Sequence, residues 1–473
     1  MQGSREQFGS KLGFILAAAG SAVGIGNLVG FPVGAAKNGG GAFLLIYALF
    51  VAFICLPVML AEMSVGRHSQ KDPLGAYTAL SSGNRGWRLA GWLSIITPFM
   101  IAVFYSVITV WILGYLVNSV SGNLAELADP STFGSFISST SVFAYMAAVI
   151  AIMYLILQGG VKQGIEKAAK ILMPALFLML IALVGFVLTR DNAMAGVEFY
   201  LVPDFDKINA SVINGALSQA FFSLSLGMGI MITYGSYIDA RSDIPGSAKL
   251  VALTDTAVAF TAGLMILPAI FSFNPEVNPA ELSESSVSMI FSYLPQIFLE
   301  LQNSIGYVGA SLVASVFFLL VFFAAITSLV SIFEVPIAAL MSEKNMQRKP
   351  ALLSCGLLLI VLSTVCALSF GFVGFFTEFV SYAGSTKSFF DVVVDVFYET
   401  ILPLNGLLIC LFVIYRWKKH NFHRELDTGA PAFKNSLFER YVTFSVGTFI
   451  PFLLFVIFIN TVAQKYFGVA LIG

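Results

Sequence analysis

Residues 20–27 read Gly-Ser-Ala-Val-Gly-Ile-Gly-Asn and lie inside an apolar stretch near residues 11–36. The first two glycines have the spacing of an interface between closely packed helices. Packing does not explain the third glycine or the polar Asn27 at membrane depth. Unwound backbone is tolerated in a membrane only where protein buries it or where it lines a cavity. The stretch therefore predicts a broken helix beside a binding cavity.

The composition excludes a soluble protein. Of the 473 residues, 58% are apolar and 11% are charged, whereas about 25% are charged in typical soluble proteins. The net charge of -1 argues against a nucleic-acid partner, which would require basic patches. The four cysteines fall inside apolar runs and the three histidines beside basic stretches, which fits neither a disulfide framework nor a Cys/His metal site.

Apolar stretches long enough to cross a bilayer, about 20 residues each, indicate eleven membrane-spanning helices. They lie near residues 11–36, 41–66, 88–121, 141–158, 166–189, 212–238, 248–273, 306–340, 351–373, 386–415 and 439–463. An odd number places the two termini on opposite sides. With a cytoplasmic N-terminus, 20 of the 25 basic residues face inside, as the positive-inside rule requires. The five that then face outside are Lys37, Arg190, Lys207, Lys387 and Lys465.

A second interruption occurs in the sixth span, where residues 223–229 read Ser-Leu-Ser-Leu-Gly-Met-Gly. The first and sixth spans are the first members of two five-helix halves. Interrupted helices at corresponding positions of two halves indicate a transporter binding site. We expect a first repeat over 5–190, a second over 191–415, and a cytoplasmic loop with the last span over 416–473. The outer loop 274–305 carries apolar residues at helical spacing, which favours a lid over a helix at the membrane interface.

Polar residues at membrane depth are costly and usually functional. Asn27, Ser223, Asp255, Thr327 and Ser328 offer only oxygen ligands, which hard cations prefer. An alkali cation is the expected guest. For each of the acids Glu62, Asp255, Glu334, Asp391 and Asp395, the alternative interpretation is a helix-end residue that reaches the interface.

Four segments carry a resemblance to a known family. They are residues 20–27, residues 38–43 (Asn-Gly-Gly-Gly-Ala-Phe), residues 222–227 (Phe-Ser-Leu-Ser-Leu-Gly) and residues 323–328 (Phe-Ala-Ala-Ile-Thr-Ser). Together they resemble the neurotransmitter:sodium symporters, in particular the bacterial amino-acid transporters with the LeuT fold. The resemblance implies an all-α protein of the bacterial plasma membrane, with eleven transmembrane helices in a 5+5 inverted repeat whose first and sixth helices are discontinuous. The N-terminus is expected in the cytoplasm and the C-terminus outside.

The resemblance implies two sodium sites. The first would use Ala22, Asn27, Ser223 and Asp255. The second would use Gly20, Val23, Ala324, Thr327 and Ser328. The family often has Asn at the position of Asp255, so a fixed carboxylate there would replace the chloride that animal members require. Tyr47 and Gln219 match two chloride-site positions, but Ala259 stands where a serine ligand is expected, so no chloride is predicted.

The resemblance also implies a substrate site between the two breaks. Tyr105 would hold a substrate carboxylate near Gly26, and the side-chain pocket would be apolar. Gly24 occupies the position where monoamine transporters carry Asp, which disfavours an amine without a carboxylate. The predicted substrate residues are Ala22, Ile25, Gly26, Ile101, Tyr105, Phe222, Ser223, Ser225, Met228, Ser328 and Ile332.

The gates depart from the family pattern. Val29-Gly30 replaces the usual Trp-Arg, so the acid expected in the outer gate, Asp395, lacks its arginine. Either the gate is looser and closes by packing of Phe222 and Tyr105 or through water, or Asp395 is free to meet a polar substrate group. At the cytoplasmic gate Arg5 and Tyr237 match the family. The usual acid aligns with Ser342, which leaves Glu343 as a candidate.

These observations predict a sodium-coupled symporter that imports a neutral apolar amino acid with two sodium ions and without chloride. It would bind amino acid, sodium and the lipid bilayer, and no nucleic acid. The alternatives are a transporter of taurine or another β- or γ-amino acid, and a sensor that binds without transport. An enzyme is not expected, because no nucleophile–base pair or catalytic metal set lies at membrane depth.

Overall fold

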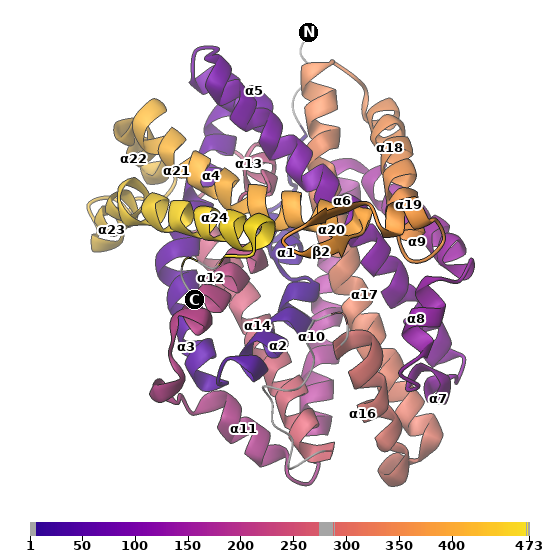
Figure 1. Ribbon diagram of the computed structural model, residues 1–473. Coiled ribbons are helices and arrows are strands. Elements are labelled where there is room, and N and C mark those ends of the chain that lie inside the picture. The colour runs from indigo at the N-terminus through magenta and orange to yellow at the C-terminus, as the bar shows by residue number, and fades with distance from the viewer. Residues whose placement is uncertain (1–5, 274–286, 288, 470, 472–473) are drawn as a thin grey trace.

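The computed structural model describes residues 6–273, 287, 289–469 and 471. Nearly all of its regular structure is helical (Figure 1). The longer helices are α1 (Lys11–Ala22), α2 (Phe31–Lys37), α3 (Gly41–Phe50), α4 (Leu56–Ser69), α5 (Pro73–Leu80), α6 (Arg85–Val120), α9 (Ser141–Leu157), α10 (Lys167–Val187), α11 (Ala193–Leu201), α12 (Ala210–Ser223), α13 (Ile230–Gly235), α14 (Ile244–Phe273), α16 (Leu294–Glu300), α17 (Gln302–Glu343), α18 (Arg348–Leu368), α21 (Leu402–Leu411), α22 (Lys419–Asp427), α23 (Leu437–Gly447) and α24 (Phe449–Phe467).

Short elements connect these helices. They are α7 (Leu124–Leu127), α8 (Thr132–Ile137), α19 (Gly374–Thr377), α20 (Phe389–Val393), a 3₁₀ turn (Phe205–Lys207) and six π-helical segments: η1 (Gly26–Gly30), η2 (Val51–Cys55), η3 (Gly160–Glu166), η6 (Met289–Tyr293), η7 (Val394–Ile401) and η8 (Phe412–Arg416). Strands β1 (Val380–Tyr382) and β2 (Ser385–Lys387) form an antiparallel hairpin in which Val380 pairs with Lys387.

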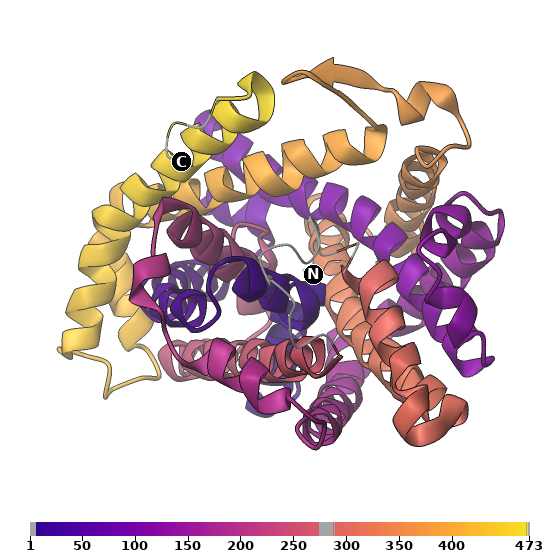
Figure 2. The same ribbon diagram turned by 60° about the horizontal axis from the view of Figure 1, so that its bottom comes forward.

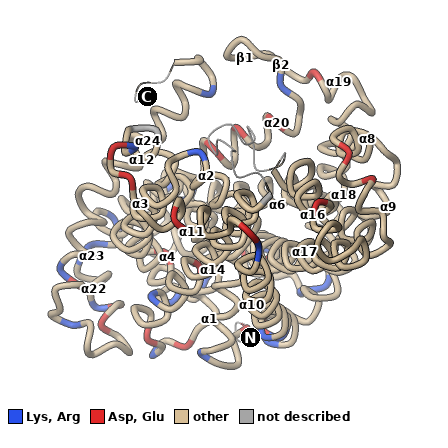
Figure 3. Tube along the Cα trace, turned by 90° about the horizontal axis from the view of Figure 1, so that it is seen from below, with Lys and Arg blue, Asp and Glu red and all other residues tan. Residues whose placement is uncertain are grey.

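Among the described residues, eight helical stretches are long and apolar enough to cross a membrane, and a ninth forms if α1 and the bent segment after it count as one span. Two further predicted spans correspond to α9, which is shorter, and to the broken pair α12 and α13. The exact number of eleven therefore stays a prediction. Figure 3 shows charged residues as sparse marks along a largely uncharged trace, as the membrane composition requires.

The first predicted break is present. α1 ends at Ala22, Val23 adopts an extended conformation with φ -69° and ψ 103°, and the two halves of the span meet at 55°. Figure 2 shows α1 and α2, in indigo, surrounded by later helices. The unwound backbone is therefore buried in protein, as lipid would not solvate its free polar groups.

The second predicted break is also present, between α12 and α13. Ser225, Gly227 and Gly229 there have φ values of 53°, 75° and 66°. Glycine reaches this left-handed region readily because it has no Cβ. Ser225 adopts it despite its side chain, and its hydroxyl donates to the carbonyl oxygen of Ser21 over 2.9 Å. The two breaks thus contact each other.

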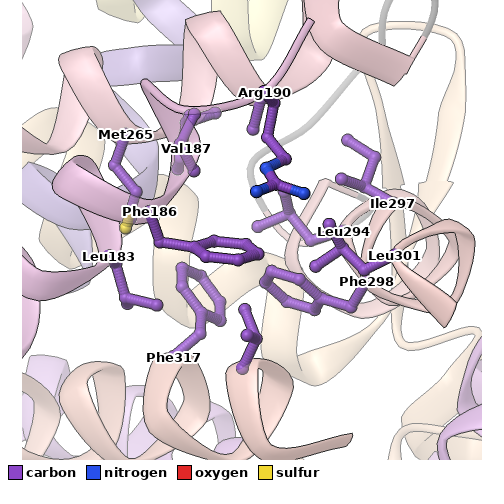
Figure 4. A pocket seen from close by; sticks show the side chains of 13 residues that line it. Leu183, Phe186, Val187, Arg190, Met265, Leu294, Ile297, Phe298, Leu301 and Phe317 are labelled. Carbon is purple, nitrogen blue, oxygen red and sulfur yellow. The ribbon is translucent and has the colours of Figure 1, made fainter. Parts of the chain in front are cut away.

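The described part of the predicted lid packs onto the bundle. Phe291 is fully buried and stacks on Phe133 with ring centroids 4.8 Å apart. Beneath α16, a small apolar cavity of about 30 Å³ lies between α10, α14 and α17. Figure 4 shows Arg190 pointing toward the rings of Phe186 and Phe298 that line this cavity. Part of the predicted lid, residues 274–286 and 288, lies outside the described residues.

Candidate functional site

A polar cluster joins the first break to α12 and α14. The amide nitrogen of Asn27 donates hydrogen bonds to Ser223 Oγ at 2.8 Å and to Asp255 Oδ1 at 2.7 Å. The hydroxyl of Ser223 lies 2.9 Å from Asp255 Oδ2. All three residues are at most 1% exposed. The structure therefore brings together three of the four residues expected at the first sodium site.

Among the described residues, the hydrogen-bonding neighbours of the Asp255 carboxylate are all neutral. Besides Asn27 and Ser223, Tyr47 donates its hydroxyl to Oδ2 at 3.2 Å. No salt bridge reaches Asp255 in the part of the chain that the structure describes. A buried carboxylate without a cation is costly, so this cluster is electrostatically suited to a bound cation. Its oxygen donors fit an alkali ion.

A second cluster surrounds Ser328 on α17. Its hydroxyl lies 3.1 Å from the carbonyl oxygens of Ser21 and Val23, and 3.4 Å from that of Gly20. These carbonyls are free because α1 stops at this point. The structure thus brings Ser328 together with Gly20 and Val23 of the predicted second sodium site, and it adds the Ser21 carbonyl, which the sequence did not predict there.

Thr327 lies next to this cluster but bonds within its own helix. Its hydroxyl donates to the carbonyl oxygens of Phe323 and Ala324, both at 3.0 Å. The predicted ligands Thr327 and Ala324 are thus adjacent to each other. Their joint role with Ser328 stays a prediction.

The backbone freed in the second break is capped by side chains from two other helices. Glu62 on α4 accepts a hydrogen bond from the Gly227 nitrogen at 2.7 Å. Asn405 on α21 donates to the Gly227 carbonyl at 2.9 Å. Glu62 is 1% exposed, so it is not a helix-end residue that reaches the interface. The Glu62 carboxyl group thus satisfies a backbone N–H that the break leaves without a partner in its own helix.

The expected substrate carboxylate site is built closely around the first break. Tyr105 Oη accepts a hydrogen bond from the Ile25 nitrogen at 3.3 Å. A Cβ at Gly24 would lie 2.8 Å from Ser328 Oγ and 2.9 Å from Tyr105 Oη, so any larger residue would have to displace one of these side chains. A Cβ at Gly26 would lie 2.9 Å from the Phe222 ring.

The remaining predicted substrate residues are buried near these helices. Ala22, Ile101, Met228 and Ile332 are each 5% exposed or less. Their buried positions are compatible with an apolar pocket, and their contact with substrate stays a prediction.

The chloride-site residues have other partners here. Gln219 donates its amide to the Gly26 carbonyl at 2.8 Å, and Tyr47 contacts Ser223 and Asp255. Ala259 is fully buried on α14. The Asp255 carboxylate thus faces Tyr47 at the position where chloride would be expected in relatives.

Asp395 already has protein partners in this structure, which disfavours the second of the two outer-gate alternatives. Tyr382 donates its hydroxyl to Asp395 Oδ2 at 2.6 Å, and Lys465 Nζ lies 3.3 Å from Oδ1. The same ammonium group lies 2.5 Å from Glu399 Oε2. Asp395 is bonded in this way because β1 and α24 both pack beside η7.

The aromatic packing at the outer gate also differs from the expectation. The ring that meets Phe222 edge to face is Tyr398, with centroids 4.5 Å apart and planes at 86°. Tyr398 also contacts Phe104 on α6, with centroids 6.0 Å apart. The sequence predicts no gate role for Tyr398 or for Lys465, which is expected only to face outside, because neither lies in a recognisable motif.

At the opposite end of the bundle, Tyr237 donates to Glu334 Oε1 at 2.8 Å. Arg348 forms an ion pair with the same carboxylate at 2.6 Å and reaches Glu6 at 3.3 Å. Glu334 is fully buried, so it is a paired acid rather than an interfacial one. Arg5 lies outside the described residues, and the candidate Glu343 is exposed at the end of α17.

A membrane protein with two broken helices that contact each other, and with oxygen-lined clusters beside them, has the architecture of a secondary transporter. The chain belongs to the sodium:neurotransmitter symporter family, whose model matches residues 5–129 and 131–469. It is therefore a transporter and not an enzyme.

Relatives cover most of the chain. It is 34% identical over 462 residues to the uncharacterized sodium-dependent transporter YhdH of Bacillus subtilis, which covers 96% of this chain and 97% of that protein. A more distant relative is the sodium-dependent dopamine transporter of Caenorhabditis elegans, 27% identical over 56% of this chain and 52% of its own length. The crystal structure of MhsT in complex with L-phenylalanine matches with a TM-score of 0.81 and 36% identity, covering 96% of this chain and 99% of MhsT. This match confirms the LeuT fold.

Proposed function

We propose that this chain imports a neutral apolar amino acid together with two sodium ions, and that it does so without chloride. The observation that carries the proposal is the buried Asp255 carboxylate, bonded only to the neutral Asn27, Ser223 and Tyr47. It supplies a fixed negative charge beside the expected sodium. The relation to a structure that holds L-phenylalanine supports an amino acid as substrate.

In this proposal the substrate carboxylate meets Tyr105 Oη and the space beside Gly26. The amino group meets backbone oxygens exposed at the two breaks, near Ala22 and Phe222, together with the Ser225 hydroxyl. Buried Ile25, Ile101, Met228 and Ile332 surround the side chain. Such a pocket separates ligands that differ by one methylene by only about 1–3 kcal/mol, so several apolar amino acids should compete.

Coupling follows from shared groups. Ser223 belongs to both the substrate site and the first sodium site, and Ser328 to both the substrate site and the second. When ions and substrate both favour the same closed state, each raises the apparent affinity for the other. Alternating access then moves one group of helices around the fixed site.

The test is uptake by purified protein in proteoliposomes with potassium inside and sodium outside, with chloride or gluconate as the anion. The labelled panel contains Leu, Ile, Met, Phe and Trp, with taurine, a γ-amino acid and Lys. We expect concentrative, sodium-dependent uptake of the apolar amino acids that is equal in both anions. Uptake of taurine or Lys instead would contradict the apolar pocket. Binding of the apolar amino acids without uptake would identify a sensor.

A further inference from the structure

The outer end of η7 is held by an ion-pair cluster that we name the η7 latch: Lys465 of α24 with Asp395 and Glu399 of η7. Lys465 Nζ lies 3.3 Å from Asp395 and 2.5 Å from Glu399. The Asp395 side chain is 7% exposed, and those of Lys465 and Glu399 are 32% and 29% exposed. Half-buried ion pairs of this kind are screened less than exposed ones.

Neighbouring polar contacts reinforce the latch. Thr400 lies 3.1 Å from the Tyr466 hydroxyl, so a second residue of α24 contacts η7. Tyr382 of β1 donates to Asp395, and its ring lies 5.4 Å from that of Tyr466. Three separate elements, namely η7, α24 and β1, are thus fastened together at one end of the bundle.

The latch residues lie next to the ring that covers the candidate site. Tyr398 precedes Glu399 directly and packs on Phe222, whose ring in turn lies against Gly26 in the first break. Access from this end requires Tyr398 to separate from Phe222. Because Tyr398 is carried by η7, the grip of α24 on η7 restrains that separation.

A cavity of about 300 Å³ lies between α12, η7, α21 and α24, and both Tyr398 and Glu399 line it. Apart from the contact of Tyr398 with Phe222, this cavity separates η7 from α12. Figures 1 and 2 show α24 running beside α21. The ion pairs to Lys465 therefore carry more of the positioning of η7 than they would in a filled interface.

We propose that Lys465 is a positioning residue of the outer gate: by binding Asp395 and Glu399 it holds Tyr398 over Phe222 and keeps the path from outside closed. The positive charge of this gate is the Lys465 ammonium group on α24, because the residue at position 30 of η1 is an uncharged glycine. The inference rests on the proposed function only for the identity of the candidate substrate site, which lies beyond the Tyr398–Phe222 contact.

The test measures how accessible the candidate substrate site is from outside, rather than transport. Ile101 lies one turn before Tyr105 on the same face of α6 and is 0% exposed. In an Ile101→Cys protein, the rate of reaction with a membrane-impermeant thiol reagent applied outside reports opening. The natural cysteines Cys55, Cys355, Cys366 and Cys410 are all buried, and the unsubstituted chain gives their background.

We expect Lys465→Gln to raise this rate about tenfold, because loss of a half-buried ion pair that favours the closed gate shifts the conformational equilibrium by about that much. Lys465→Arg keeps the charge and should react like the Ile101→Cys parent. Lys465→Glu combined with Glu399→Lys should restore much of the slow rate. Lys207→Gln removes an exposed lysine with 53% side-chain exposure and serves as the matched control.

An unchanged rate in Lys465→Gln would overturn the proposal, as would an equal increase in Lys207→Gln. Size-exclusion elution and thermal unfolding of each variant identify misfolded protein. If Lys465→Gln misfolds, the labelling rate of the charge-reversed pair Lys465→Glu with Glu399→Lys still tests the ion pair. Absence of sodium-dependent amino-acid uptake in the unsubstituted chain would count against the proposed function alone, because the labelling readout does not depend on transport.

Discussion

Asn27 on the first broken helix and Asp255 on α14 are joined by a 2.7 Å hydrogen bond in a fully buried environment. They are 228 residues apart in the chain. The contact places the Asn27 amide nitrogen against the carboxylate, with the Ser223 hydroxyl beside both, while the Asn27 amide oxygen accepts a hydrogen bond from the Gly24 nitrogen at 3.1 Å. The electrostatics of the site thus depend on one acid.

Replacing that acid tests the origin of sodium affinity. We expect Asp255→Asn to raise the sodium concentration for half-maximal uptake about tenfold, because a full charge attracts a cation more strongly than an amide dipole does. Uptake by this variant should also become stimulated by chloride. The control is Thr256→Val on the same helix, since the Thr256 hydroxyl has no hydrogen-bond partner within the described structure. Equal sodium dependence in Asp255→Asn and the wild type would refute the role of the charge.

Ser328 offers a second, independent test. Removing its hydroxyl in Ser328→Ala takes away the donor that faces the carbonyl oxygens of Ser21 and Val23. We expect about a tenfold loss of apparent sodium affinity, since a lost buried hydrogen bond typically costs about 1–3 kcal/mol. Ser311→Ala on the same helix is the control, because the buried Ser311 hydroxyl has no partner among described residues. The measurement is uptake as a function of sodium concentration.

Gly24 tests the closeness of the first break to the opposing helices. In Gly24→Ala the new methyl would lie 2.8 Å from Ser328 Oγ and 2.9 Å from Tyr105 Oη. We expect uptake to fall at least about tenfold and the melting temperature to decrease, because overpacking typically costs about 1–3 kcal/mol. Gly185→Ala on α10 meets no atom within 4 Å and should leave uptake unchanged. Full activity of Gly24→Ala would show that the site is more open than the structure indicates.

The ion pair between Arg348 and Glu334 should contribute strongly to stability. Glu334 has no exposed side-chain surface, and that of Arg348 is 12% exposed. Removing one partner of such a pair costs about 3–5 kcal/mol, because the other charge stays buried. We expect Arg348→Met to lower the melting temperature markedly and Arg348→Met with Glu334→Gln to lower it less.

The exposed pair between Lys11 and Asp243, with a lysine side chain that is 55% exposed, provides the control for this comparison. Lys11→Met should change the free energy of unfolding by less than about 1 kcal/mol. If it destabilised the protein as much as Arg348→Met does, burial would not be the reason for the effect at Arg348.

Glu425 predicts a pH dependence of stability. Burial raises its pKa, but the hydrogen bond from His68 and the nearby Arg67 guanidinium outweigh burial and hold the pKa below its ordinary value of 4.5. A carboxyl group whose pKa is lowered by folding stabilises the protein above the unfolded-state pKa, and this contribution is lost as pH falls through the folded-state value. The difference in melting temperature between wild type and Glu425→Gln should therefore be constant from pH 7 to about pH 5 and shrink below pH 4.5.

Asp129→Asn is the control for the pH series. The pKa of Asp129 is also lowered, by hydrogen bonds from Ser131, but the group is on the surface. Its effect on the melting temperature should be small at every pH. A difference for Glu425→Gln that grows toward acid would reverse the expected sign.

Local signals in the sequence were sufficient to predict both breaks and the polar cluster beside them. Glycine and asparagine at membrane depth have few structural uses, so Gly26 and Asn27 were informative without any knowledge of packing. Ser223 and Asp255 were recognisable for the same reason. Their mutual contacts confirm that these residues share one place, while sodium binding there remains to be measured.

The gates were predicted less well because they depend on contacts between distant segments. Tyr398 and Lys465 are ordinary residues of an interfacial helix end, and only the packing of α24 on η7 gives them a role. Likewise, Glu334 was recognised as an unusual acid, but its partner Arg348 belongs to the next helix. The absence of an arginine at position 30 did not predict that Lys465 would supply a positive charge beside Asp395.

The capping of the two breaks has a consequence for how the protein is made. The Ser21 and Val23 carbonyls face a hydroxyl more than 300 residues later in the chain, and the Gly227 carbonyl is bonded by Asn405, 178 residues later. During synthesis the first helix therefore enters the bilayer before its partner exists, and unpaired carbonyls in hydrocarbon cost several kcal/mol each. The early spans must wait at the insertion machinery or in a hydrated, provisional arrangement until α17 and α21 arrive, so the active centre is completed late in biogenesis.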